Sequence, residues 1–202
     1  MDKSLVIKTV TGSKIDTYAS ALAELRMSVF REFPYLYDGS LEYEKDYIQT
    51  YVQSEESIAV LAFDHENIVG ASTALPMQDE TPEFKLPFLN NGYNTETIFY
   101  CGESVLLEKY RGKGIYSRFF DERENHAKKL NRFKWMCFCA VQRPNDHPLR
   151  PDNYQHLYPV WNKFGYKKHP ELTAAYSWKD VDKQEETEKQ MVFWMKKLDS
   201  DK

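Results

Sequence analysis

The sequence has few cysteines, no long apolar run and no excess of positive charge. Its three cysteines fall short of the four ligands of a structural zinc site, so we expect no metal. No apolar stretch approaches the roughly 20 residues that span a bilayer. The first residues, Met1 to Ser4, lack the apolar core of a signal peptide. We therefore expect a cytoplasmic protein with no membrane partner. A net charge of −4 and a pI near 5.8 provide no basic field for nucleic acid, so no nucleic-acid partner is expected.

A globular protein is nevertheless indicated. The chain has 202 residues, of which 42% are hydrophobic, and this length predicts one domain spanning 1–202. Cys137, Phe138 and Cys139 lie in an apolar stretch that is typical of a strand. Since alternate side chains of a strand share a face, we expect both thiols to act as small core residues.

Hydrophobic periodicity predicts the order of the elements. Strands are expected at 5–7, 57–63, 68–75, 97–107, 135–141, 172–178 and 191–195, and helices at 14–31, 40–52, 114–130 and 154–164. We interpret 76–94 as a loop with one helical turn and 179–189 as a solvated connection. Gly102 interrupts the fourth strand, which suggests a bulge or a close backbone approach. Hairpin strands followed by alternating strands and helices predict a mixed α/β sheet with helices on both faces.

The segment from Glu103 to Tyr116 carries the clearest chemical signal. It is a predicted strand, a turn containing Arg111-Gly112-Lys113-Gly114, and then a helix. Glycines let the backbone N–H groups approach a ligand, and the first N–H groups of a helix are unpaired and partly positive. Together with the charges of Arg111 and Lys113, they predict a binding site for a diphosphate.

Three nucleotide-binding motifs can be compared with this turn. A Walker loop requires Gly-x4-Gly-Lys-Ser/Thr, which the sequence around Lys113 does not satisfy. A dinucleotide-binding Gly-x-Gly-x-x-Gly fails at Ser117, although a dinucleotide-binding enzyme stays a distant alternative. The third motif is Arg/Gln-x-x-Gly-x-Gly/Ala. The turn matches its first four positions but has Tyr116 where the motif requires glycine or alanine.

With this turn and with Asn162-Lys163-Phe164-Gly165-Tyr166, where a late helix ends, the chain resembles the GNAT family, the GCN5-related N-acetyltransferases. The resemblance covers nearly the whole chain. It implies a mixed, mostly antiparallel central sheet with splayed central strands and helices on both faces. It also implies that acetyl-CoA is the cofactor and that a small-molecule or peptide amine is the acceptor. The implied cofactor-binding residues are Val105, Leu106, Leu107, Arg111, Gly112, Lys113, Gly114, Ile115 and Tyr116.

Two departures from the family pattern matter. Tyr116 replaces a small residue at the start of the helix, where its ring could reshape the diphosphate site or point into the core. In many family members a tyrosine of the late helix protonates the departing thiolate, and alignment on Gly165 puts Trp161 at that position. Tyr158 and Tyr154 are the candidate substitutes. A thiol pKa near ~8.5 also makes the thiolate a tolerable leaving group without an acid.

Glu103 is the candidate catalytic base. An amine with a pKa of about 10 arrives as an ammonium and must lose a proton before it attacks a thioester. Glu103 lies within the apolar Tyr100-Cys101-Gly102 stretch, where burial raises the basicity of a carboxylate. A structural carboxylate that binds a neighbouring strand or an arginine is the equal alternative.

Tyrosines and acidic residues alternate between Phe33 and Tyr51. In the GNAT family the region between the first two helices helps to form the acceptor site, so Tyr35, Tyr37 and Asp38 are the candidate substrate-binding residues. Carboxylates and tyrosine rings both attract a cation. A solvated helix face with an aromatic underside is the simpler interpretation of the same pattern.

Two functions from different classes remain. The first is an acetyl-CoA-dependent N-acetyltransferase that acts by direct transfer with help from a carboxylate base. The second is a non-catalytic module that binds acyl-CoA, which Trp161 and Tyr116 favour. The sequence does not identify the acceptor amine, and a strand such as 191–195 allows either a monomer or a homodimer.

Overall fold

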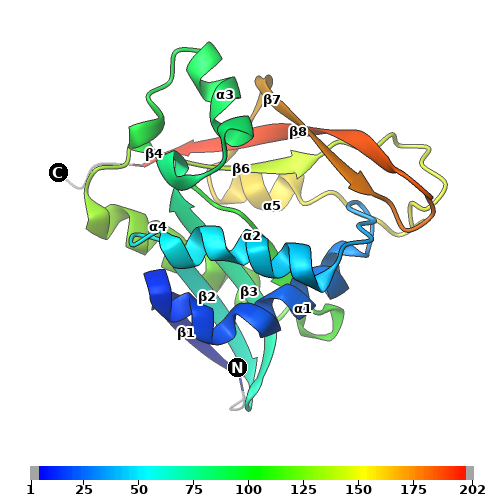
Figure 1. Ribbon diagram of the computed structural model, residues 1–202, viewed down its shortest axis with the longest axis horizontal. Coiled ribbons are helices and arrows are strands. Elements are labelled where there is room, and N and C mark those ends of the chain that lie inside the picture. Colours follow the sequence, from blue (N-terminus) through cyan, green and yellow to red (C-terminus); the bar gives the residue numbers. More distant parts are fainter. Residues whose placement is uncertain (1–4, 199–202) are drawn as a thin grey trace.

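A mixed sheet of eight strands runs through residues 5–198, the part of the chain that this computed structural model describes, and helices flank it (Figure 1). The residues from Met1 to Ser4, used above in the signal-peptide argument, lie outside this part. The strands are β1 (Leu5–Thr11), β2 (Ile58–Asp64), β3 (Asn67–Pro76), β4 (Ile98–Tyr100), β5 (Ser104–Leu106), β6 (Trp135–Val141), β7 (Lys167–Lys179) and β8 (Glu186–Lys197). The α-helices are α1 (Ala19–Phe30), α2 (Leu41–Gln53), α3 (Pro82–Asn90), α4 (Ile115–Leu130) and α5 (Tyr158–Lys163).

The strand order confirms the predicted fold class. It runs β1-β2-β3-β4-β6-β8-β7, and β5 pairs with β3 outside this path. Neighbouring strands are antiparallel except for β4 and β6, which are parallel. Within residues 5–198, no helix is long and apolar enough to cross a bilayer.

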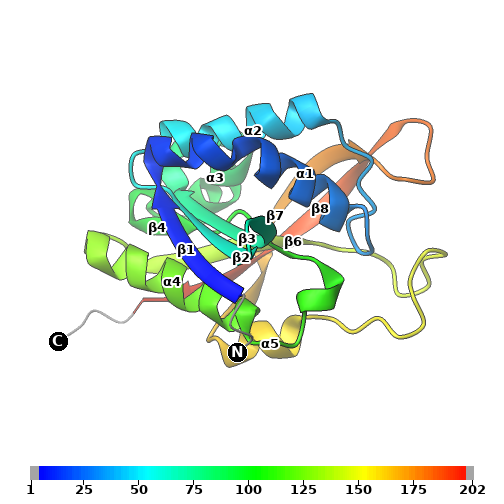
Figure 2. The same cartoon turned by 90° about the horizontal axis from the view of Figure 1, so that it is seen from below.

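Two hydrophobic cores lie on opposite faces of the sheet. Successive side chains of a strand alternate between faces, so Leu61 of β2 joins the core beneath α1, α2 and α3, while Val60 joins the core beneath α4 and α5. Figure 2 shows these two helical layers above and below the sheet. Burial on both faces explains the continuous apolar run of β2. The predicted core role of Cys137 and Cys139 is confirmed, since both are buried in the first core.

The strand predicted at 97–107 divides into β4 and β5. β4 pairs with both β3 and β6, whereas β5 pairs with β3 alone, so β5 and the end of β6 diverge. The division occurs at Gly102, where an added Cβ would lie 1.7 Å from the hydroxyl oxygen of Tyr51. The close approach predicted at Gly102 and the splayed central strands are therefore both confirmed.

The predicted helical segments differ from the structure in three places. The segment 14–31 begins in a 3-10 helix, Gly12–Tyr18, and continues as α1. The predicted loop at 76–94 contains α3, which begins at Pro82, because proline fits the first turn of a helix. The helix predicted at 154–164 is only the six-residue α5, since Pro159 can lie only in a first turn.

The two C-terminal strands are longer than predicted. The predicted solvated connection at 179–189 is exposed over 182–188, but its bounds are wrong, and Asp180 and Lys189 are buried. β7 continues to Lys179 and β8 begins at Glu186, so only 180–185 connects them. Lys189 is buried, donates hydrogen bonds to the carbonyl oxygens of Trp178 and Thr187, and forms an ion pair with Asp180 at 3.2 Å. These partners let a charged residue lie within a strand that borders the core.

Candidate functional site

The turn before α4 has the geometry of an anion-binding site. Gly112 and Gly114 have φ angles of 76° and 81°, a region that favours glycine. Gly114 precedes the 16-residue α4, and no side chain caps the helix N-terminus. A Cβ built on either glycine would meet no atom of the described residues within 4 Å. The turn therefore has open space beside it, and the first N–H groups of α4, which have no partner within the helix, suit a diphosphate.

Two cations flank this turn. Arg111 forms an ion pair with Glu32 at 2.7 Å and donates a hydrogen bond from Nε to the carbonyl oxygen of Leu106 at 3.2 Å. The Nζ of Lys113 lies 5.2 Å from the centre of the Tyr110 ring. Arg111 thus connects the turn to the end of β5 and to the segment after α1.

The outer edge of β5 offers backbone groups beside this turn. Leu107 N donates to Val69 O, and Leu106 lies opposite Gly70 in the antiparallel register with β3. Since bonded and non-bonded pairs alternate along such a ladder, the N–H and C=O of Leu106 point away from β3. The C=O accepts the hydrogen bond from Arg111 Nε, so the N–H of Leu106 is the group that this edge offers to a ligand. No strand of the described chain pairs with this edge. An extended ligand can therefore add to it where β5 and β6 diverge.

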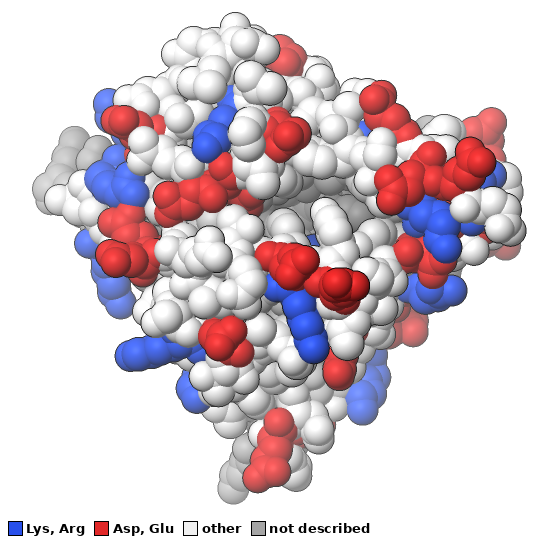
Figure 3. Space-filling view, in the orientation of Figure 1, with Lys and Arg blue, Asp and Glu red and all other residues white. Residues whose placement is uncertain are grey.

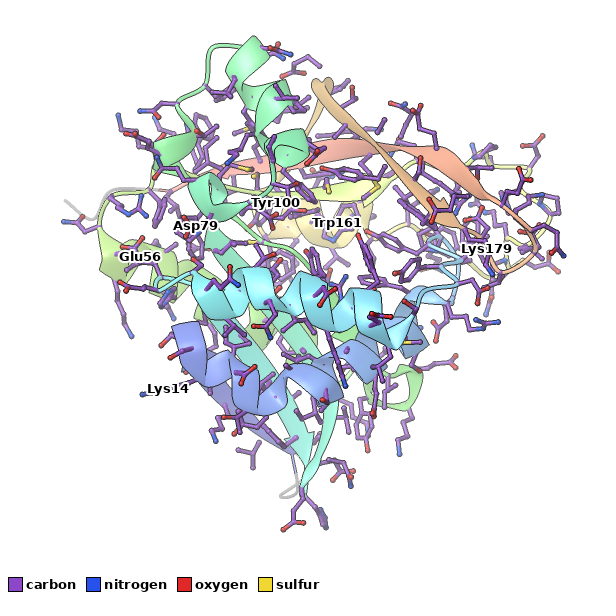
Figure 4. The ribbon with its side chains drawn as sticks, in the orientation of Figure 1. Lys14, Glu56, Asp79, Tyr100, Trp161 and Lys179 are labelled. Atoms are coloured by element: carbon purple, nitrogen blue, oxygen red, sulfur yellow. The ribbon has the colours of Figure 1, made fainter. Side chains whose placement is uncertain are left out.

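A cavity of about 500 Å³ lies on the other side of the divergence. α1, α2, α3, the segment before α2 and the β7–β8 hairpin supply its walls. Figure 3 shows a hollow above α2 with acidic side chains on several sides. In Figure 4, Tyr100 lies near the middle of the molecule and Lys179 lies toward the hairpin. Tyr100, Gly102 and Cys139 line the cavity, so it reaches the point where the central strands separate.

A buried ionic cluster forms part of this cavity. Arg26 of α1 donates a hydrogen bond from Nε to Glu44 of α2, and its Nη1 lies 2.5 Å from Oε2 of Glu103. The three residues are 7%, 0% and 6% exposed. Arg26 and Glu44 line the cavity, whereas the Glu103 carboxylate contacts Arg26 behind them. The ion pair with Arg26 is the contact that the structural alternative for Glu103 predicted, and it lies at the edge of the cavity.

Burial is the largest effect on the pKa values of Arg26 and Glu103. It raises the pKa of the Glu103 carboxyl above its ordinary value, although Arg26 opposes the change. Burial lowers the pKa of the Arg26 guanidinium, but Glu103 and Glu44 outweigh it, so that pKa stays well above its ordinary value. Arg26 is therefore a permanent cation, while Glu103 has an increased affinity for a proton.

The three acceptor residues proposed from the sequence, Tyr35, Tyr37 and Asp38, all line the cavity. Asp38 is already paired, with Arg31 and with Lys179, each at 2.7 Å. Hydrogen bonds from these two cations keep the pKa of the Asp38 carboxyl below its usual value. The structure thus brings the three residues together, and the charge of Asp38 is neutralised by Arg31 and by Lys179, which also lines the cavity.

The departures from the family pattern meet in an aromatic cluster on the opposite face of the sheet. The hydroxyl of Tyr116 accepts a hydrogen bond from Trp161 Nε1 at 3.1 Å, and its ring packs against Phe120. Trp161, near the middle of Figure 4, also packs against Tyr158, with ring centres 5.5 Å apart. The Tyr116 side chain is therefore directed toward the α5 side of the fold.

Tyr154 and Tyr158 lie outside the cavity lining. Tyr154 packs edge-on against Phe33, and Tyr158 stacks on His156 with ring centres 4.5 Å apart. Neither tyrosine belongs to the cavity lining in the described part of the chain. The structure does not bring these two candidate acids together with Glu103.

Sequence reasoning missed Arg26 and the β7 wall of the cavity, and it did not single out Glu44. Arg26 follows Leu22 by four residues on the apolar side of α1, and a charge within an apolar stripe was a usable signal. Glu44 was only one of the acidic residues between Phe33 and Tyr51 whose carboxylates were expected to attract a cation. Tyr176 and Trp178 were assigned to a strand, and no local pattern indicated that this strand lines the cavity.

No family model matches the chain, and no curated protein sequence matches it. Solved structures do match, and three are instructive. An acetyltransferase of the GNAT family from Streptococcus pneumoniae is 12% identical with a TM-score of 0.58, covering 96% of this chain and 99% of that one. An aminoglycoside 6'-N-acetyltransferase complexed with coenzyme A is 16% identical with a TM-score of 0.59, covering 98% and 99%. A ribosomal-protein-alanine N-acetyltransferase from Brucella melitensis is 12% identical with a TM-score of 0.61, covering 96% and 99%. The chain therefore has the fold of the GNAT acetyltransferases.

Proposed function

We propose that this chain is an N-acetyltransferase that moves an acetyl group from acetyl-CoA to a primary amine. One observation carries the proposal, namely that two sites meet where β5 and β6 diverge. One site is the anion-binding turn with the unpaired edge of β5, and the other is the cavity of about 500 Å³. An enzyme that joins two substrates needs two such sites in contact, because positioning supplies much of the rate enhancement. The solved acetyltransferases of the same fold support the proposal.

The residues present fit acetyl-CoA. The turn from Arg111 to Gly114 and the first residues of α4, Ile115 and Tyr116, would hold the diphosphate. The edge from Val105 to Leu107 would hold the pantetheine arm by backbone hydrogen bonds. When bound, acetyl-CoA supplies a thioester whose carbonyl carbon is open to attack by an amine.

We propose Glu103 as the proton acceptor, directly or through one water. The ammonium of the acceptor gives one proton to the Glu103 carboxylate. The freed lone pair then forms the N–C bond, the C–S bond breaks with its electron pair on sulfur, and the second nitrogen proton neutralises the thiolate. Burial raises the pKa of the Glu103 carboxyl and so makes the carboxylate more basic, while the neighbouring Arg26 favours its ionised form.

The donor of the last proton need not be a side chain. A thiolate with a conjugate-acid pKa near ~8.5 departs without one. Tyr158 and Tyr154 remain our candidate donors, and of the two we prefer Tyr158, because it contacts Trp161 in α5. A fall in kcat for Tyr158→Phe that exceeds that for Tyr154→Phe would support this order.

Glu103→Gln is expected to lower kcat by about a hundredfold, because a positioned base contributes a factor of that order. The dissociation constant for CoA should stay unchanged, since the carboxylate lies on the cavity side of the strand division. Release of CoA thiol, measured from pH 5.5 to 9 across a panel of amines, tests the rate, and calorimetric titration tests CoA binding. The limb of the wild-type pH profile that reports the base should disappear in the variant.

Glu24→Gln provides the control, because Glu24 is an exposed carboxylate on the same helix as Arg26. It should keep the wild-type rate and pH profile. Turnover in Glu103→Gln at the wild-type rate and with the wild-type profile would remove Glu103 from its role and leave the enzyme intact. If no amine stimulates thiol release although CoA binds, the chain is an acyl-CoA-binding module.

Gly112→Val is expected to weaken CoA binding at least tenfold, about 1.4 kcal/mol. A β-branched residue is strained at the φ of 76° that the turn requires. Gly92→Val is a matched control, because Gly92 also has a φ of 76° and open space around it. Gly92 lies outside the proposed site, so this variant should lose similar stability and keep wild-type CoA affinity. Equal CoA affinities for the two variants would contradict the placement of the diphosphate.

A further inference from the structure

We propose that the acceptor is a primary amine with a single positive charge on an aromatic or otherwise apolar body, and that Glu44 binds its ammonium group. This inference rests on the proposed acetyltransferase function and names the class of amine. It differs from the residues that the sequence suggested, because the cation-binding carboxylate lies on α2 within the cavity, and Asp38 is not required for it.

The buried cluster can accommodate one more positive charge when both of its carboxylates are ionised. Two carboxylates, Glu44 and Glu103, share one guanidinium, that of Arg26. The cluster therefore has a net charge of −1 when both acids are ionised, in an environment that scarcely solvates it. One ammonium would neutralise it.

The free atoms of the cluster show where that cation would bind. Oε1 of Glu44 and Oε1 of Glu103 are buried and accept no hydrogen bond of good geometry among the described residues. The hydroxyls of Tyr37 and Thr73 are the neighbours that interact with these two carboxylates. Buried carboxylate oxygens without a donor are unfavourable, and an ammonium group provides three donors. Glu44 lines the cavity whereas Glu103 does not, so Glu44 is the carboxylate that an acceptor in the cavity reaches first.

The walls of the cavity suit an apolar body. Trp178 stacks on Tyr35 with ring centres 6.1 Å apart. The ring centre of Phe84 lies 4.9 Å from that of Tyr100 and 4.8 Å from that of Tyr176. All five rings line the cavity. Aromatic faces bury flat or alkyl groups well and hold a nearby cation by cation–π attraction.

The remaining charges of the lining do not favour a polycation. Asp38 is neutralised by Arg31 and Lys179. Glu186 lies exposed on the hairpin, where water and salt screen its charge. A second or third ammonium would therefore lose its hydration against aromatic rings without gaining a buried carboxylate. An amine that also carries a carboxylate would place it beside the negative cluster.

The test compares three acceptors with acetyl-CoA and the wild-type protein: 2-phenylethylamine, spermidine and L-phenylalanine. We expect kcat/KM for 2-phenylethylamine to exceed the other two values at least tenfold. Glu44→Gln should raise the KM for 2-phenylethylamine about tenfold and change kcat less than threefold. Glu42→Gln, which alters an exposed carboxylate of the same helix, should leave both parameters at their wild-type values. If Glu44→Gln does not fold, the wild-type comparison alone decides.

A binding measurement separates this inference from the proposed function. Trp178 lies in the cavity wall, so 2-phenylethylamine should change the tryptophan fluorescence saturably without acetyl-CoA, and Trp178→Phe should remove that change. Saturable binding without turnover of any amine would support the acceptor class and contradict the transferase. Turnover that prefers spermidine would overturn the acceptor class and support the transferase. Absence of both binding and turnover with 2-phenylethylamine would also overturn the acceptor class.

Discussion

Arg26→Met is expected to lower the free energy of unfolding at pH 7 by about 3–5 kcal/mol, the range found when one partner of a buried ion pair is removed. Arg26 is 7% exposed and donates to both Glu44 and Glu103. Its removal leaves two buried carboxylates side by side with no counter-charge. Glu44 lies on α2, and Glu103 lies between β4 and β5. Urea unfolding followed by circular dichroism measures the change.

The physical reason can be separated from lost packing. The guanidinium carbon of Arg26 lies 5.0 and 4.2 Å from the ring centres of Phe30 and Tyr47. Methionine replaces the apolar stem of the arginine and removes only its charged end. If uncompensated charge dominates, adding Glu44→Met and Glu103→Met should recover most of the lost stability, since an apolar replacement of a whole buried ionic cluster is often neutral. A triple variant as unstable as Arg26→Met would show that packing dominates.

The fold was predictable because its signals are local. The apolar run of β2 and the turn from Arg111 to Gly114 each depend on a few consecutive residues. Gly102 indicated the division between β4 and β5, since a close backbone approach is a common reason for glycine in a strand. α3 was missed because Pro82 and Pro87 resemble loop residues, although Phe88 buries fully in the core.

The candidate site was only partly predictable because its partners are remote in the sequence. Arg26 and Glu103 are 77 residues apart, and no periodicity specifies such a pair. Glu103 was singled out because a charge within an apolar strand requires a partner, but the sequence could not show that the partner is a cation on α1. Asp38 was identified as an acceptor ligand, and only tertiary structure shows that Lys179 neutralises it. Residue types and neighbours thus indicated the chemistry, whereas the folded chain determines the charge balance.

Glu80→Gln is expected to remove a loss of stability that the wild-type protein undergoes as the pH rises. Glu80 is 3% exposed and borders an open cavity of about 690 Å³. Asp79 lines the same cavity and lies near the C-terminal end of α2 in Figure 4. Its Oε2 accepts a hydrogen bond from Thr81 N, but its Oε1 has no partner among the described residues. Burial raises the pKa of the Glu80 carboxyl from 4.5 to about 7.

The sign of the effect follows from proton linkage. Because the folded-state pKa of Glu80 is higher than the unfolded-state value, the unfolded chain loses this proton first as the pH rises. Stability from Glu80 is therefore fully present below about pH 4.5 and is lost as the pH passes through about 7. A difference of about 2.5 pKa units corresponds to about 3 kcal/mol. Glutamine cannot ionise, so the variant lacks this contribution to the pH dependence.

The measurement is the difference in unfolding free energy between Glu80→Gln and wild type, taken from urea titrations at pH 4 and at pH 8. It should be about 3 kcal/mol more favourable to the variant at pH 8 than at pH 4. Taking the difference between two pH values cancels the cost of burying the glutamine amide itself. Glu55→Gln is the control, because Glu55 lines the same cavity but is exposed, and it should parallel wild type. A Glu80→Gln curve parallel to wild type would mean that water reaches Glu80 through the open cavity and solvates its charge.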